Sequence, residues 1–122
     1  MNRKEFLEQL DVVKKQQHIM SKDDIKQTLK KSVNTSDGVR DARGQRSAII
    51  AIQELNELSV ELTNWLRGKD GKLGLLEEMA DVQIGLYTMQ EFLGITDEEL
   101  EAAIDVKMRR LNHTIDCNGT FS

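Results

Sequence analysis

Residues 51–58 read AIQELNEL and residues 76–82 read LEEMADV. Each segment carries two acidic side chains three residues apart. The four acids are Glu54, Glu57, Glu78 and Asp81. On an α-helix, residues i and i+3 lie side by side, so each pair directs two carboxylates the same way. A short turn between two such helices would bring the pairs face to face. The sequence therefore predicts two facing helices with four clustered carboxylates.

Apolar residues at helical spacing extend both segments into long helices. The first helix is predicted over residues 40–66 and the second over residues 73–93. The glycine-containing residues 67–72 interrupt the pattern between them. Gly94 is the expected C-terminal cap of the second helix.

The segments on either side are also helical in pattern. Residues 3–17 predict a first amphipathic helix, and Ser21 predicts the N-cap of a second. Residues 34–38 have the composition of a loop. Thr96 begins a capping box for a last helix that reaches about Ile115.

The composition of the whole chain is that of a helical protein. It has no proline and only 4% aromatic residues, and it is rich in Leu, Glu, Lys, Gln and Met. A domain of 122 residues can bury roughly two-thirds of its unfolded surface. We therefore expect an all-α, four-to-five-helix bundle with one compact core. We divide it into an N-terminal helical arm (1–34), a helical domain (35–116) and a C-terminal tail (117–122).

Charge and cysteine usage restrict the class of protein. The single Cys117 cannot form an internal disulfide, and no apolar run has the length of a signal peptide or membrane span. We expect a cytoplasmic protein with no membrane partner. The net charge of −4 argues against stable nucleic-acid binding. Residues 1–46 hold eleven basic and seven acidic residues, whereas residues 47–122 hold six and fourteen. The basic segment is most simply a solvated helical arm.

The four acids have two interpretations. Clustered carboxylates repel one another unless a cation lies among them, and an all-oxygen ligand set suits Mg²⁺ or Mn²⁺ better than zinc. Ordinary surface charges would have the same spacing, so spacing alone leaves both interpretations open. Glu54, Glu57 and Glu61 lie along one edge of the apolar stripe, where partial desolvation penalises a charge without a partner. Gly85 falls on the corresponding band of the next helix and leaves room for a ligand.

Together with their surroundings, these motifs resemble the MazG-like nucleotide pyrophosphohydrolases. These proteins belong to the all-α NTP pyrophosphatase superfamily, which also includes dimeric dUTPases. The resemblance covers residues 43–114. The segments that carry it are AIQELNEL (51–58), WLRGK (65–69), LEEMADV (76–82) and KMRRL (107–111).

The resemblance implies a bundle of the MazG-like type and a reaction. In it the four acids are both the metal ligands and the catalytic residues, and they bind Mg²⁺, for which Mn²⁺ can substitute. The reaction splits an NTP or dNTP into a nucleoside monophosphate and pyrophosphate, a task of nucleotide-pool housekeeping. Lys107 and Arg110 are permanent donors suited to substrate phosphates. Their structural alternative is ion pairing with neighbouring acids of the last helix.

Further residues are candidates for supporting roles. Glu61 and Glu77 are candidates to hold the metal ligands in place without contacting the metal themselves. Trp65 is a core or interface residue by its position, with contact to a nucleobase as the alternative. Tyr87 and Phe92 are weaker candidates for that same contact.

Assembly and exact activity are also expectations at this point. The two long helices are apolar over a wide arc, which predicts a homodimer or a dimer of dimers. A dUTP-specific pyrophosphatase of the same superfamily is one alternative function. A non-catalytic helical interaction or regulatory module, whose acids are surface charges, is the other.

Overall fold

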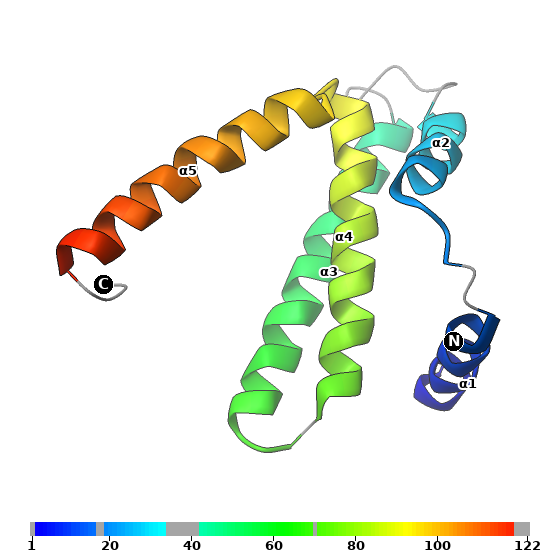
Figure 1. Cartoon of the computed structure of the whole chain (residues 1–122). Helices are drawn as coiled ribbons and strands as arrows, with labels where there is room; N and C mark the ends of the chain where they lie inside the picture. Colours follow the sequence, from blue (N-terminus) through cyan, green and yellow to red (C-terminus); the bar gives the residue numbers. More distant parts are fainter. Residues whose placement is uncertain (1, 17–18, 34–41, 70, 119–122) are drawn as a thin grey trace.

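The computed structural model describes residues 2–16, 19–33, 42–69 and 71–118. Over these residues the protein is all-α, with five helices and no strand, as predicted (Figure 1). The helices are α1 (Arg3–Gln16), α2 (Lys22–Val33), α3 (Ala42–Leu66), α4 (Lys72–Leu93) and α5 (Asp97–Asn118). None of the helices in the described ranges is both long and apolar enough to cross a membrane.

The helix ends use the caps that the sequence predicts. The backbone N–H of Asp24 donates to the Ser21 hydroxyl at 3.1 Å, at the start of α2. The backbone N–H of Glu99 donates to the Thr96 hydroxyl at 3.1 Å, at the start of α5. Gly94 ends α4 in the left-handed conformation, with φ of 68°. These local signals therefore position three of the boundaries correctly.

The predicted end of the last helix differs from the structure, and one predicted loop lies outside the residues that the structure describes. The last helix continues to Asn118, past the predicted end at Ile115 and into the predicted tail. The predicted loop at residues 34–38 lies outside the described residues.

An antiparallel hairpin of α3 and α4 forms the centre of the molecule (Figure 1). The turn after α3 contains Gly68, whose φ of 72° is in the left-handed region. The two helices approach closely at Gly85, where an added Cβ would lie 3.6 Å from the Cβ of Ala51. Helix α2 packs on α4, and α1 lies beside α4 with a smaller contact. This packing fixes how the acids of α3 meet those of α4.

A polar network joins α2 to the corner between α4 and α5. The Lys26 ammonium binds the Asp97 carboxylate, donates to Gln90 Oε1 at 3.3 Å and lies 4.9 Å from the Tyr87 ring centroid. The Gln90 amide donates to Asp97 Oδ1 at 3.1 Å. Gln90 is buried, so the network satisfies a polar group that would otherwise be costly to bury.

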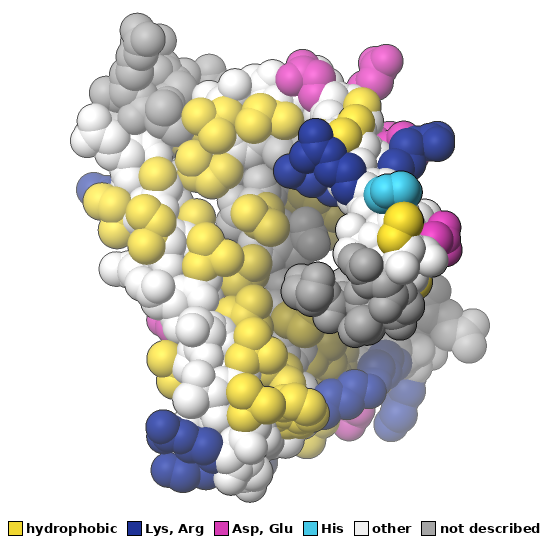
Figure 2. Space-filling model, turned by 90° about the vertical axis from the view of Figure 1, so that its left-hand side faces the viewer, with side chains coloured by type: hydrophobic (Ala, Val, Ile, Leu, Met, Phe, Trp, Pro, Cys, Tyr) yellow, Lys and Arg dark blue, Asp and Glu magenta, His cyan; other side chains and the backbone are white. Residues whose placement is uncertain are grey.

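The single chain buries little apolar surface. Its accessible area is 9531 Å², whereas a compact protein of 13.9 kDa exposes roughly 6,700 Å². Phe92, at 8% exposure, is the one hydrophobic side chain buried to this degree among the described residues. Helix α5 projects away from the hairpin (Figure 1), and a broad band of apolar side chains lies open on the side toward which it projects (Figure 2). The expectation of one compact core is therefore wrong for the isolated chain.

Candidate metal centre

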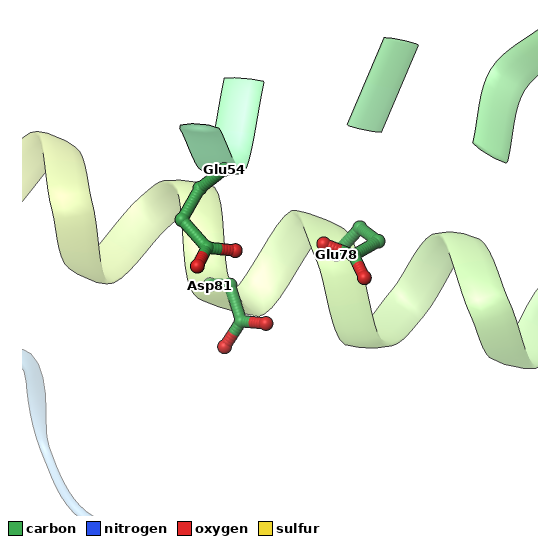
Figure 3. A group of neighbouring side chains, drawn as sticks. All are labelled: Glu54, Glu78 and Asp81. Carbon is green, nitrogen blue, oxygen red and sulfur yellow. The ribbon is translucent and has the colours of Figure 1, made fainter. Parts of the chain in front are cut away.

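Three of the four predicted acids converge where α3 faces α4. Glu54 comes from α3, and Glu78 and Asp81 come from α4 (Figure 3). One carboxylate oxygen from each lies within 4.8 Å of the others. The two acidic helices thus face each other as predicted. We refer to Glu54, Glu78 and Asp81 as the acidic cluster.

The fourth acid, Glu57, flanks the acidic cluster. It is exposed on the next turn of α3 and is not one of the three mutually close carboxylates. With Glu61 and Glu78, it lines a shallow pocket of about 240 Å³. Its negative charge still raises the pKa of each of the three clustered carboxyls.

Several carboxylate oxygens near the cluster are buried without a hydrogen-bond partner. Among the described residues these are Oε2 of Glu54, Oε2 of Glu61 and Oε2 of Glu78. A buried polar atom without a partner costs about 1–3 kcal/mol, and more when it is charged. A divalent cation would satisfy such oxygens, and the all-oxygen donor set is the set that Mg²⁺ and Mn²⁺ prefer. The residues of the cluster therefore fit a hard divalent cation.

Burial and mutual repulsion disfavour the charged form of all three clustered carboxyls. Burial, followed by the charges of Glu57, Asp81 and Glu54, raises the pKa of Glu78 to about 7. Burial also raises the pKa of Glu54, and Asp81 and Glu57 add to the effect. For Asp81, burial raises the pKa first, then Glu77 and Glu57, while a hydrogen bond with Glu54 opposes them. Because a cation needs the deprotonated ligands, its binding at neutral pH must release protons.

The predicted supporting residues Glu61 and Glu77 are both held by Arg3 of α1. Arg3 Nε donates to Glu77 Oε2 at 3.0 Å, and Arg3 Nη2 lies 3.6 Å from Glu61 Oε1. At Gly74, an added Cβ would lie 2.6 Å from Glu61 Oε2 and 2.7 Å from Arg3 Nη1. A larger residue here would displace the ends of these two side chains. Sequence reasoning missed Arg3, because it interpreted the basic N-terminal segment as a solvated helical arm.

A cavity of about 270 Å³ opens between α3 and α4 beside Glu54 and Asp81. Gly85 lines it, next to its contact with Ala51. Ser47 and Thr88 also line it and supply hydroxyl groups. The cluster is therefore open to a ligand from this side of the hairpin.

The other predicted contacts do not lie at the acidic cluster of the same chain. Helix α5 carries Lys107 and Arg110 away from the hairpin (Figure 1), and both side chains are exposed. Trp65 is 51% exposed, and eleven residues separate it from Glu54, a rise of roughly 16 Å along α3.

The acids predicted as alternative partners of the basic pair have other contacts. Asp105 accepts from Arg109 Nε at 2.7 Å, and Glu101 lies 4.0 Å from Lys22. The two weaker candidates for contact with a nucleobase contact other parts of the protein instead. Tyr87 lies against Lys26, and Phe92 is buried in the core.

Comparison with protein-family models, curated proteins and solved structures gives no match for this chain. The function is therefore argued from the residues themselves. They form an acidic cluster on two packed helices, with buried oxygens that lack partners and an open cavity alongside.

Proposed function

We propose that the protein is an Mg²⁺-dependent nucleoside triphosphate pyrophosphohydrolase of the MazG-like type. The observation that carries this proposal is the convergence of three carboxylates from two helices within 4.8 Å. The buried oxygens of Glu54 and Glu78 that lack partners support it, because protons or a cation would stabilise such a group at neutral pH. We further propose a role in nucleotide-pool housekeeping in the cytoplasm.

In this proposal the residues divide into ligands and a water-orienting group. Glu54, Glu78 and Asp81 hold the metal. Mg²⁺, when bound, neutralises triphosphate charge and makes a bound water more acidic. Glu57 lies beside the cluster and is our candidate to orient the attacking water and accept its proton. Water adds to phosphorus as the bond between the α and β phosphates breaks, giving a nucleoside monophosphate and pyrophosphate.

The proposal includes a homodimer or a dimer of dimers. The chain exposes 9531 Å², roughly 2,800 Å² more than a compact chain of its mass. A standard interface buries about 800 Å² per partner and a large obligate interface up to about 2,500 Å², so one obligate interface would account for most of the excess. A second copy would also provide a way to bring Lys107 and Arg110 to the acids. Light scattering should give a mass of at least twice 13.9 kDa, and a mass of one chain at micromolar concentration would contradict the dimer.

A non-catalytic interaction module is the second candidate function. The exposed apolar band favours it, because exposed apolar surface of this extent marks interaction sites (Figure 2). Such a module needs no metal, so Mg²⁺ should leave its melting temperature unchanged. A metal-dependent hydrolase should instead be stabilised by Mg²⁺ even without substrate.

A substrate panel tests the proposed reaction. The common NTPs and dNTPs, including dUTP, are incubated with the protein in Mg²⁺, Mn²⁺ or EDTA, and each phosphorus product is measured. We expect monophosphate and pyrophosphate with either metal, and no products with EDTA or with Glu78→Gln. Activity confined to dUTP would select the dUTP-specific alternative. Orthophosphate plus diphosphate would refute the proposed bond, and no hydrolysis of any nucleotide would refute the enzyme.

A further inference from the structure

A second, larger cavity lies between α1 and α4. Its volume is about 530 Å³, within the range of about 300–1,000 Å³ typical of small-molecule sites. Its apolar lining consists of Phe6, Leu10 and Val13 from α1 with Ala80 and Ile84 from α4. Its polar lining consists of Gln9, Glu77 and Asp81. One end of a mostly apolar pocket is thus formed by a member of the acidic cluster.

The wall formed by α1 depends on one anchor. Arg3 binds Glu61 of α3 and Glu77 of α4 at the same time, and Gly74 provides the space for its guanidinium. Apart from this anchor, α1 makes only a small contact with α4. The anchor therefore helps to hold the second wall of the pocket in place.

We propose that this pocket receives the nucleobase and sugar of the nucleotide whose phosphates bind at the acidic cluster. The inference rests on the proposed function and adds the substrate subsite and the role of α1. Asp81 and Ile84 line both this pocket and the cavity beside Glu54, so the two spaces adjoin. An occupant that fills both spaces would join a mostly apolar body to a group that binds a cation held by carboxylates. A nucleotide has both parts within one molecule.

The polar lining agrees with a base rather than with a simple hydrocarbon. The Gln9 amide offers both a donor and an acceptor, which the edge of a nucleobase can pair with. Glu77 and Asp81 are acidic, so an anionic lipid headgroup in this pocket would be repelled, whereas the uncharged base and sugar of a nucleotide would not. Gln9 is therefore the residue that discriminates between bases in this inference.

Binding of two ligands tests the subsite directly. The ligands are a non-hydrolysable α,β-methylene nucleoside triphosphate and inorganic tripolyphosphate, which has no base, each titrated with Mg²⁺ by calorimetry. Leu10→Trp and Ala80→Leu fill the pocket from opposite walls. Val12→Trp introduces the same side chain on α1 at an exposed position that does not line the pocket.

The two pocket variants should each weaken binding of the nucleotide analogue at least tenfold and change tripolyphosphate binding less than twofold. Val12→Trp should change neither. Gln9→Leu should alter the ratio of kcat/KM between different bases and leave tripolyphosphate binding intact. Circular dichroism on every variant confirms that its helix content is retained.

Three outcomes would overturn the subsite. The first is unchanged binding of the nucleotide analogue to both pocket variants, and the second is equal weakening of both ligands. The third is a change from dimer to monomer in the pocket variants, which would show that a second copy fills the pocket. In each of these three outcomes the wild type still hydrolyses nucleotides. If the proposed function itself is wrong, the wild type neither hydrolyses nor binds them.

Discussion

Replacing Glu78 by Gln should stabilise the metal-free protein and remove its response to Mg²⁺. Oxygens of Glu54, Glu78 and Asp81 lie within 4.8 Å of one another. At this distance two charges repel by about 3.5 kcal/mol at an effective dielectric of 20, and by about 0.9 kcal/mol in water. Glu54 and Glu78 are only partly buried and Asp81 is exposed, so the lower figure is the better guide. The variant should gain about 1 kcal/mol per relieved pair at a pH where the cluster is ionised.

Thermal melting in EDTA at pH 8 measures this gain. This pH is above the pKa of Glu78 of about 7, so its carboxyl is charged in the wild type. A gain of 1 kcal/mol corresponds to a rise in Tm of roughly 3–6 °C for a domain of this size. Mg²⁺ at a hundred times its Kd should stabilise the wild type by about 2.7 kcal/mol and the variant by much less. Glu8→Gln removes the same charge from an exposed position on α1 and should behave as the wild type.

Two results would refute this reasoning. A clear loss of stability of Glu78→Gln in EDTA at pH 8 would make Glu78 a structural partner of some other group. An undiminished Mg²⁺ response in the variant would place the cation away from the acidic cluster.

Three other predictions follow from the contacts described. Between about pH 4.5 and 7 the metal-free wild type should lose stability relative to Glu78→Gln as pH rises, because the folded protein keeps a proton on Glu78 that the unfolded chain releases. Thermal melts of both proteins across this range in EDTA measure the difference. A difference that changes with pH in the opposite direction would contradict the raised pKa. Glu57→Gln should abolish pyrophosphate release yet keep most of the Mg²⁺-induced rise in Tm, since Glu57 lies outside the cluster. If this variant still hydrolyses nucleotides, Glu57 is not the water-orienting group. Lys26→Met should lower the free energy of unfolding, measured by denaturant titration, by about 1–3 kcal/mol, because Gln90 and Asp97 lose the donor that they share. Lys22→Met, at a half-exposed position, should leave that free energy nearly unchanged.

Local sequence signals predicted the helices well because each signal acts within a few residues. Ser21, Gly94 and Thr96 satisfy backbone groups of their own helix ends, so no tertiary information is needed to identify them. The i and i+3 spacing likewise predicted which faces carry the acids. The meeting of three acids additionally required the helix register, which the close approach of Gly85 to Ala51 fixes and the spacing alone does not.

The contacts that sequence reasoning missed join residues far apart in the chain. Arg3 meets Glu77 across 74 positions, and Lys26 meets Asp97 across 71. Helical periodicity carries no information on such pairs, because it describes one helix at a time. The direction of α5 was missed for the same reason, since it depends on the corner after Gly94 rather than on the helix itself. For this reason the sequence could not show that Lys107 and Arg110 lie away from the acidic cluster of their own chain.

A small change of backbone angle at the corner between α4 and α5 would move the far end of α5 by a large distance. Helix α5 has 22 residues and is therefore about 33 Å long. A rotation of about 10° at the corner would move its far end by roughly 6 Å, a distance comparable with one turn of helix. Gly94 and the Lys26 network lie at this corner, where the angle between α4 and α5 is set. A substitution at the corner can thus redirect the exposed apolar and basic groups of α5 without touching any of them.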